Sequence, residues 1–367
     1  MDSNRYRFLF TIVVALFTIL LTYRFLGPDR FYSIVGKIES EILLISGLTT
    51  VNTGTPDSPI ITDPDITLNP LGRIGLGAYI FGLFDETKVS EIDKYQNLIG
   101  HRLQFVLLFR AWDDFDKEFP SALLNELDKR DIVPIVTWEP WKRDFKNPTL
   151  IDTKYSLEAI SVGLHDEYIR EWARASRAFG SLYILRFGHE QSTFPGEQSW
   201  YPWQGRPEAY VKAYQRIVDI FREEGALNVR YMWNPVMFWP DTTLRYYPGD
   251  TYVDYLGLTV LNHGADGNPS DRRWKRCDEQ YIKQYSVIRS IDRPVIVVEF
   301  GSTERGGLKD EWISECIRMM QDNPRLVGII TLENKSDPTH PGINWSVNSS
   351  YNSLKAFKEA VSIPLFK

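Results

Sequence analysis

"YILRFGHEQSTFPGEQSWYPW", residues 183–203, begins as an apolar run with the character of a strand and ends in a cluster of aromatic residues. Between these two parts stands His189-Glu190, in a chain that contains 5 histidines. A carboxylate that follows an apolar run is costly to bury unless it is paired or reaches an exposed strand end. We therefore interpret this stretch as a buried strand that delivers a polar pair to the edge of a larger sheet.

Seven other apolar runs share this character and alternate with segments of helical periodicity. They begin at residues 73, 103, 131, 229, 252, 294 and 326. Near-continuous apolar strands are typical of parallel sheets that helices cover on both faces. Eight such β-α units within residues 71–367 predict a (β/α)₈ TIM barrel. A doubly wound open sheet is the alternative, although "GLGAYIFG" at 75–82 lacks the G-x-G-x-x-G spacing of its phosphate turn.

The composition excludes some classes of function. The net charge is -6, so the chain has no basic excess of the kind that nucleic-acid binding requires, and we expect no nucleic-acid partner. Its two cysteines, Cys277 and Cys316, have no metal-ligand spacing, so we expect no metal. They could pair in an oxidising compartment or remain as two buried thiols, and the sequence leaves both alternatives open.

The N-terminal segment has the pattern of a membrane anchor. Arg5 and Arg7 precede residues 8–23, which carry no charge and have nearly the length that a bilayer core requires. Tyr-Arg-Phe-Leu follows, without the small residues of a cleavage site, so we expect an uncleaved, single-pass transmembrane signal anchor in residues 1–27. The charge bias predicts an extracytoplasmic domain at the cell membrane. Residues 28–70 are expected to form a juxtamembrane helix and a linker rich in Thr, Pro and Ser.

Polar and aromatic residues stand where the apolar runs end, and in a barrel these ends carry the active site. The ends read "RAWDD" (110–114), "TWEPW" (137–141), "GHE" (188–190), "WNP" (233–235), "LNH" (261–263), Glu299 and "LENKSD" (332–337). Aromatic faces that stack on sugar rings, together with carboxylates for proton transfer and nucleophilic attack, are the components of a carbohydrate site.

Glu190 and Glu299 are the candidate catalytic residues. They end the fourth and seventh runs, which a barrel places on roughly opposite sides of its opening, so the two carboxylates can face each other across a substrate. Retaining glycosidases place such a pair about 5 Å apart, and inverting enzymes place it farther apart. The alternative is that each acid is a paired charge, with Arg110 or Arg186 as its partner, and that His189 is a core histidine rather than a substrate contact.

Four motifs together resemble glycoside hydrolase family 26. They are "LRFGHEQ…SWYPWQG", "IVTWEPW", "YYPGDTYVDYLGL" and "PVIVVEFGS", and the resemblance covers about residues 71–360. It implies a (β/α)₈ barrel and a retaining mechanism without a cofactor, with Glu190 as acid/base and Glu299 as nucleophile. His189 would border the cleavage point. Trp138, Trp141, Tyr201 and Trp203 are candidates for lining the cleft. Arg186 and Asn262 match motif positions, and we expect Asn262 to contact the substrate.

Three departures from the family pattern concentrate near the cleavage point. Gln191-Ser192-Thr193 replaces Met-Asn-Gly, and an insertion within 191–199 separates Glu190 from the "WYPW" motif. Leu261 stands where the family has a Tyr before the Asn of the sixth strand. The eighth run ends in Leu332-Glu333 rather than in a Trp, with Trp345 as a candidate replacement. We expect these changes to alter substrate choice.

The sequence thus predicts an endo-acting glycosidase that cleaves β-linked polysaccharide, of the β-mannan or β-glucan type, at the cell surface. A tether to the membrane suits an exopolysaccharide under export. One alternative is a non-catalytic polysaccharide-binding accessory of an exopolysaccharide synthase, in complex with that synthase. Another is a transglycosylase, which would use the same residues with a sugar as acceptor.

Overall fold

The computed structural model describes residues 73–113, 116–142, 153–192, 200–236, 240–267, 272–336 and 342–366, and all of these belong to one compact unit. The expected membrane anchor of residues 1–27 and the expected linker of residues 28–70 lie outside the described residues. Within the described ranges, no helix combines the length and the apolar character that crossing a bilayer demands.

Eight parallel strands close into a barrel, each paired with its neighbours in chain order and the last with the first. They are β1 (Gly75–Ile80), β2 (Phe105–Ala111), β3 (Val133–Glu139), β4 (Tyr183–Phe187), β5 (Val229–Trp233), β6 (Tyr255–Asn262), β7 (Val295–Ser302) and β8 (Leu326–Glu333). The predicted barrel is therefore confirmed, and the open-sheet alternative is wrong because β1 and β8 are hydrogen-bonded over six residue pairs.

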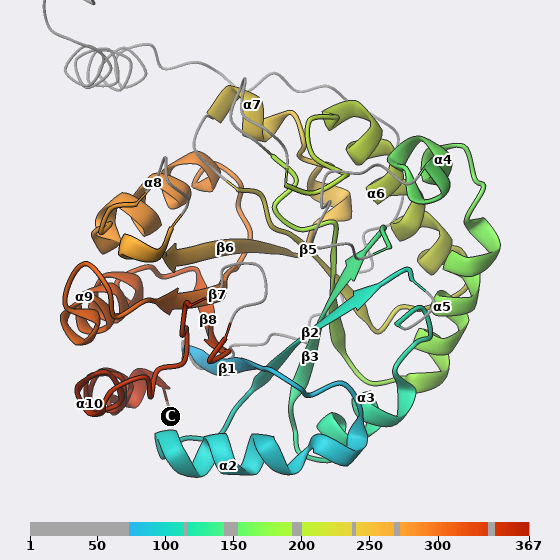
Figure 1. The fold of residues 1–367 in the computed structure, drawn as a ribbon. Helices are drawn as coiled ribbons and strands as arrows, with labels where there is room; N and C mark the ends of the chain where they lie inside the picture. The colour runs from blue at the N-terminus through green and yellow to red at the C-terminus, as the bar shows by residue number, and fades with distance from the viewer. Residues whose placement is uncertain are drawn as a thin grey trace, which may run out of the picture. The chain divides into compact units, whose positions relative to one another are not determined.

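Helices surround the barrel, as Figure 1 shows. The α-helices are α2 (Ser90–Ile99), α3 (Ser121–Asp128), α4 (Leu157–Ser161), α5 (Asp166–Phe179), α6 (Pro207–Glu223), α7 (Pro240–Leu244), α8 (Cys277–Ile288), α9 (Lys309–Gln321) and α10 (Tyr351–Val361). Short 3-10 helices are η1 (Glu86–Lys88), η2 (Thr153–Tyr155), η3 (Asp250–Tyr252), η4 (Gly264–Asp266) and η5 (Pro364–Phe366). Helix α5 illustrates how such a helix is stabilised. Acidic residues occupy its first turn, one apolar face is buried, and Gly180 ends it in the left-handed conformation.

Strand alternation divides the buried side chains into two cores. The larger core lies between the strands and the helices. The smaller one fills the barrel interior, and its buried members are Phe105, Leu107, Ile135, Ile184, Met232, Tyr255, Ile296, Val298, Val327 and Ile330. Because successive side chains point to opposite faces, each strand contributes to both cores. The inward or outward register of a residue near a strand end therefore decides whether it can meet a substrate.

A bulge in β7 changes this register just before the end of the strand. Leu258 of β6 pairs with Val297, but the next residue, Thr259, pairs with Glu299, so β7 contains one extra residue. Val298 belongs to the interior core, and the Glu299 carboxylate also reaches into the barrel, where it meets Arg186. A bulge re-aims side chains in this way. Without it, simple alternation would point Glu299 toward the helices.

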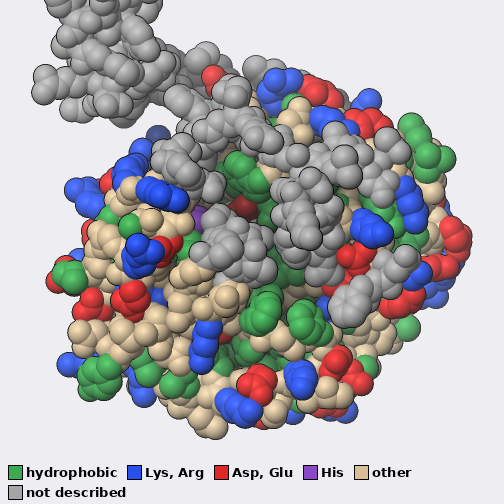
Figure 2. Space-filling view, viewed as in Figure 1, with side chains coloured by type: hydrophobic (Ala, Val, Ile, Leu, Met, Phe, Trp, Pro, Cys, Tyr) green, Lys and Arg blue, Asp and Glu red, His purple; other side chains and the backbone are tan. Residues whose placement is uncertain are grey.

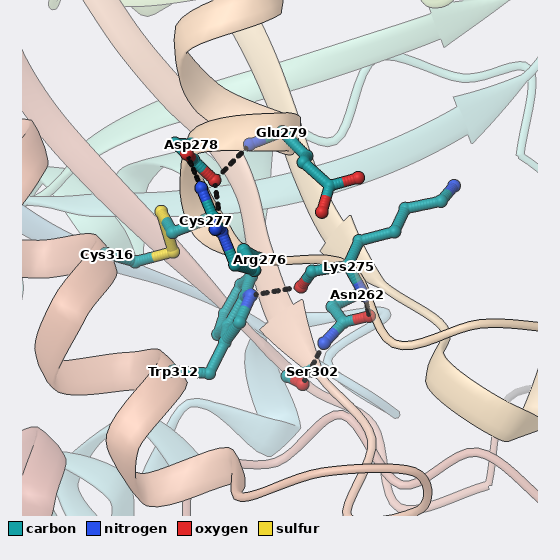
Figure 3. The surroundings of a disulfide bond; sticks show 9 residues. All are labelled: Asn262, Lys275, Arg276, Cys277, Asp278, Glu279, Ser302, Trp312 and Cys316. Carbon is teal, nitrogen blue, oxygen red and sulfur yellow. Dashed lines mark hydrogen bonds and ion pairs between the residues drawn. A yellow bond between two sulfur atoms is a disulfide. The ribbon is translucent and has the colours of Figure 1, made fainter. Parts of the chain in front are cut away.

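A disulfide joins the helices that follow β6 and β7. Cys277 at the start of α8 is bonded to Cys316 in α9, across 39 positions of sequence (Figure 3). Of the two alternatives that the sequence left open, the structure has the disulfide. The segment leading into α8 is held from two further sides, because Trp312 Nε1 donates to the Lys275 carbonyl and the Lys275 N–H donates to Asn262.

Candidate active site

Glu190 lies just past the end of β4 in a strained backbone conformation. Its φ is 52°, in the left-handed region that non-glycine residues rarely adopt. Two backbone hydrogen bonds hold it there: its N–H donates to the Asn234 carbonyl (2.7 Å), and its carbonyl accepts from Gln204 Nε2 (2.6 Å). Strain that the surroundings enforce in this way is common at functional sites. The carboxylate accepts from Trp200 Nε1 at 3.3 Å.

Arg186 connects the interior of the barrel to Glu299. It is fully buried, and its Nη1 donates to Glu299 Oε1 and to Asn234 Oδ1, each at 2.8 Å. Its Nε donates to Thr137 Oγ1 at 2.7 Å. A buried carboxylate needs such a charge-compensating, hydrogen-bonded partner. Of the two arginines considered from sequence, Arg186 is therefore the partner of Glu299.

Glu190 and Glu299 act on each other electrostatically. Loss of contact with water raises the pKa of Glu190 to about 7, and the negative charge of Glu299 contributes to the rise. Arg186 and hydrogen bonds from Thr259 and Trp200 oppose it. One carboxyl group near neutral pKa beside a second that is paired with a guanidinium is the arrangement that separates an acid from a nucleophile. The structure thus brings the two predicted catalytic residues into one site.

An aromatic group supports His189. Tyr201 and Trp203 are stacked with ring centroids 4.6 Å apart, and Trp141 meets both rings edge-on at 5.6 Å. Tyr201 is partly exposed, whereas Trp203 is buried and its Nε1 donates to the His189 carbonyl at 2.7 Å. Three predicted residues, Trp141, Tyr201 and Trp203, therefore gather beside the acid, with Tyr201 the most accessible of them.

The His189 ring is buried between Tyr201 and a third carboxylate. Its Nε2 lies 3.1 Å from the Tyr201 hydroxyl, and its Nδ1 lies 3.7 Å from Glu139 Oε1. Burial and the neighbouring Arg186 guanidinium lower the pKa of His189 well below its usual range. The ring is therefore neutral at pH 7. From the sequence, His189 could be a core histidine, a substrate contact or a residue that orients the acid. The ring is 2% exposed and its nitrogens face Tyr201 and Glu139, so this geometry favours a buried, positioning role over substrate contact.

Glu139 at the end of β3 was not among the predicted site residues. Its side chain is buried, lies near His189 and accepts from Trp141 Nε1 at 3.4 Å. Burial raises the pKa of Glu139 to about 8, and Glu299 adds to the rise while Arg186 opposes it. Strand alternation could have found it, but only once the structure shows that Thr137 faces Arg186. Glu139 follows Thr137 by two positions, and a residue two positions from an inward-facing one also faces inward.

The prediction for Trp138 is wrong, and the same alternation explains why. It was expected to line the cleft, but it is fully buried between the barrel and the helices. Its ring packs on Trp172 of α5 with centroids 4.6 Å apart and on Trp112 at 4.7 Å. The residue faces outward because both Thr137 and Glu139, its chain neighbours, face inward. Its large apolar surface stabilises the outer core rather than a sugar.

The prediction for Asn262 is also wrong. It was expected to bind substrate, but it is fully buried and faces outward from β6, where protein groups occupy its amide (Figure 3). Its Nδ2 donates to Ser302 Oγ at 3.2 Å, and its Oδ1 accepts from the N–H groups of Gly264 and Lys275. The side chain therefore fixes the loop after β6 and the approach to α8.

The departures from the family pattern lie together at the end of the barrel. Leu261 pairs in register with Gly301, and Trp345 packs against both, since a Cβ on Gly301 would lie 3.1 Å from the Trp345 ring. Leu332 belongs to the same small cluster. Trp345 does reach the region where β6, β7 and β8 end, but its ring is 1% exposed. Apolar contacts among Leu261, Leu332 and Trp345 thus stand where the family pattern has a Tyr and a Trp.

The insertion within 191–199 is described only at its start. Gln191 and Ser192 are buried, and the Ser192 hydroxyl donates to the Val236 carbonyl. The Gln191 amide, in the orientation that satisfies both neighbours, donates to the Asn234 carbonyl (3.0 Å) and accepts from Trp233 Nε1 (2.7 Å). Residues 193–199 lie outside the described residues. Among those that are described, no group of three or more His, Cys, Asp or Glu side chains is arranged to hold a metal ion.

Comparisons with known proteins agree with this geometry. The family model described as Glycosyl hydrolase family 26 matches residues 167–276. Endoglucanase H of Acetivibrio thermocellus is 31% identical over 311 residues, which are 81% of this chain and 32% of that protein. The chain therefore spans about a third of the length of this relative.

Solved structures of low sequence identity share the fold. The catalytic domain of a Bacillus sp. JAMB-750 endo-β-1,4-mannanase has a TM-score of 0.58 and 17% identity, covering 80% of this chain and 87% of that one. A β-mannanase from Bacteroides ovatus has a TM-score of 0.58 and 16% identity, covering 81% and 90%. Family model, relative and structures together support a (β/α)₈ barrel that is similar to glycoside hydrolase family 26.

Proposed function

We propose that the protein is a retaining glycoside hydrolase that cleaves within chains of a β-linked polysaccharide of the glucan or mannan class. The observation that carries the proposal is the pair of glutamates in one site, where Glu299 is buried and Glu190 is partly exposed. Glu190 has a pKa of about 7, and Glu299 is bound to the Arg186 guanidinium at 2.8 Å. A general acid with a pKa near the working pH and an oriented carboxylate nucleophile are what a double displacement requires.

In the first step, protonated Glu190 gives its proton to the glycosidic oxygen as the bond from that oxygen to the anomeric carbon breaks. Arg186 holds Glu299 Oε1, which orients the carboxylate and leaves Oε2 to form the new bond to the anomeric carbon. The product of this step is a glycosyl ester of Glu299. The leaving sugar departs with the proton from Glu190.

In the second step, Glu190 acts as a base. Esterification removes the negative charge of Glu299, one of the two causes that raise the pKa of Glu190, so the Glu190 carboxylate is more easily maintained. It takes a proton from an incoming water as the oxygen of that water bonds to the anomeric carbon and the ester bond breaks. A sugar hydroxyl in place of water would give transglycosylation by the same residues.

We further propose that the barrel acts outside the cytoplasm, tethered by the N-terminal segment. The Cys277–Cys316 disulfide supports an oxidising compartment, where such bonds form and persist. The uncharged run of residues 8–23 supports the tether. In this setting an exopolysaccharide at the cell surface is the proposed substrate, and a polysaccharide synthase complex is a proposed partner.

A non-catalytic binding role is the second candidate. The apolar cluster of Leu261, Leu332 and Trp345 favours it, because Leu261 pairs with Gly301, two residues after Glu299 on β7. The hydrolase and the non-catalytic binding role are distinguished by an assay for reducing ends released from mixed-linkage β-glucan, β-mannan and β-xylan. We expect the unaltered protein to release them and Glu299→Gln to release almost none. Glu333→Gln is the matched control, because Glu333 is also a largely buried glutamate at a strand end but bonds toward the helices. No release from any polymer by the unaltered protein would contradict the hydrolase proposal.

A further inference from the structure

The loop after β1 displays two exposed aromatic rings. Phe81 is 52% exposed and Phe84 is 47% exposed, and their rings meet edge to face with centroids 6.3 Å apart. Among the aromatic side chains that the structure describes, only Tyr351 is comparably exposed. Figure 2 shows one face of the molecule, on which hydrophobic side chains are visible toward the centre and many charged ones around the periphery. Exposed apolar groups that cluster in this way usually mark a binding surface.

The register of β1 places Phe81 at the opening of the barrel. Ile80 pairs with Glu333 at the end of β8, and the Phe81 N–H continues the ladder by donating to the Glu333 carbonyl at 3.0 Å. Along β1 the inward-facing positions alternate, so Phe81 follows Tyr79 on the inner side. The Tyr79 ring contacts Phe109 at 5.2 Å, and Phe109 contacts His189 at 5.6 Å. A run of ring contacts therefore leads from the base of this loop to the residue beside the catalytic acid.

Buried groups fix the loop that carries the two rings. Arg110 Nη2 donates to the Phe84 carbonyl at 2.7 Å, and Arg110 is itself buried and lies 3.6 Å from the buried Asp116. Gly82 turns the chain between the two phenylalanines with a φ of 90°, a conformation that favours glycine. The rings are thus presented on a fixed backbone, so little conformational entropy is lost when a ligand orders them further.

We propose that Phe81 and Phe84 form a sugar-stacking platform, a subsite distant from the cleavage point that holds a pyranose ring of the β-linked polysaccharide. The choice of ligand rests on the proposed function. In β-linked glucose or mannose polymers, ring C–H groups make apolar faces that pack on aromatic rings, while the hydroxyl groups stay in water. A polymer that crosses the barrel opening toward Glu190 and Glu299 would extend over the loop after β1.

Binding is measured by affinity electrophoresis of the full-length protein in gels that contain mixed-linkage β-glucan, glucomannan or β-mannan. All proteins carry Glu299→Gln, so that the polymer is not degraded. We expect Phe81→Ala with Phe84→Ala to bind the preferred polymer about fivefold to tenfold more weakly, which is what the loss of one or two aromatic contacts produces. Phe81→Tyr with Phe84→Tyr should retain binding. Leu227→Ala is the control, since Leu227 is 61% exposed before β5, at the opposite end of the barrel.

Kinetics of the protein with an intact Glu299 supply the second readout. The double alanine variant should raise KM for the polymer and leave KM and kcat for a short aryl β-glycoside unchanged, because a short substrate does not reach the platform. In the electrophoresis, equal binding by Glu299→Gln with and without the double alanine substitution would overturn the platform, as would the absence of polymer binding by Glu299→Gln alone. If the variant loses binding while no polymer is ever cut, the platform stands and the hydrolase proposal fails.

Discussion

Two neighbouring strands carry a glutamate near their C-terminal ends, and the two glutamates differ in their surroundings. On β7 the Glu299 carboxylate points into the barrel and meets Arg186. On β8 the Glu333 carboxylate lies on the helix side, where it accepts from the Val347 N–H and interacts with Tyr95 of α2. Burial raises the pKa of Glu333 to about 7, so a raised pKa alone does not mark a catalytic group here. The direction of the side chain separates the two.

The same contrast recurs within a single strand. On β3, Trp138 packs among the helices while its neighbour Glu139 lies beside His189. A one-residue change of register exchanges the two faces. In β7 the bulge between the pairs of Leu258 and Thr259 performs this exchange and brings Glu299 inward. Function at a strand end therefore follows from register first and residue type second.

The largest effect is expected when Glu190 or Glu299 is replaced by glutamine, in contrast to the same replacement at Glu333, which lies on the helix side. Glu190→Gln and Glu299→Gln should each lower kcat/KM on the preferred polysaccharide by about 10²–10⁴-fold, because proton donation or nucleophilic attack is lost. Glu333→Gln should keep activity within about twofold, since its carboxylate makes only structural contacts; initial rates on one polymer check all three. Comparable losses in all three variants would show that direction does not separate the glutamates.

Substitutions of Trp138 and Tyr201 are expected to have different effects: the first should lower stability and the second should weaken substrate binding. Trp138→Ala should lower the free energy of unfolding by about 3–5 kcal/mol through the cavity it leaves in the outer core. Trp138→Phe is the milder variant if the first does not fold. Tyr201→Ala should change stability less and raise KM. Denaturant unfolding and steady-state kinetics test this, and a Trp138→Phe variant with full stability but raised KM would reverse the assignment.

The disulfide lies among the outer helices, so its removal should change stability without changing activity. Replacing Cys277 and Cys316 by serine opens a loop of 39 residues, for which the chain-entropy model gives a loss of about 3–4 kcal/mol. Thermal unfolding measures the loss, and kcat/KM at a temperature where the variant is folded should be unchanged. An unchanged unfolding temperature would contradict the stabilising role of the bond, and free thiols in the protein isolated from its natural host would contradict the extracytoplasmic proposal.

The smallest effect concerns Glu139 and depends on pH. Its folded-state pKa of about 8 exceeds the ordinary value of 4.5, so the folded state binds the proton more tightly and stability falls as pH rises from about 4.5 to 8. Glu139→Gln removes this loss. The free energy of unfolding of the variant should therefore rise relative to that of the unaltered protein at pH 9 compared with pH 5. The rise is a few kcal/mol at most, since three pKa units correspond to about 4 kcal/mol. An equal difference at both pH values would exclude a protonated Glu139.

The sequence was sufficient to predict the barrel and both catalytic candidates because apolar runs and the polar residues after them are local patterns. It misplaced Trp138 and Asn262 because residue type at a strand end does not reveal which way a side chain points. The missed Glu139 could be assigned inward only once Thr137 was seen to contact Arg186. The bulge that brings Glu299 inward is a property of strand pairing, which no local pattern in β7 records.

The roles of the two inward glutamates are tested most directly by the anomeric configuration of the azide product. The two alanine variants, Glu190→Ala and Glu299→Ala, are incubated with an activated aryl β-glycoside and sodium azide, and the glycosyl azide is examined by proton NMR. With Glu190→Ala, azide attacks the glycosyl ester of Glu299, and the β-glycosyl azide is predicted. With Glu299→Ala, azide attacks the substrate itself, and the α-glycosyl azide is predicted. The opposite pair of products, or the same anomer from both variants, would contradict the assignment of Glu190 as acid/base and Glu299 as nucleophile.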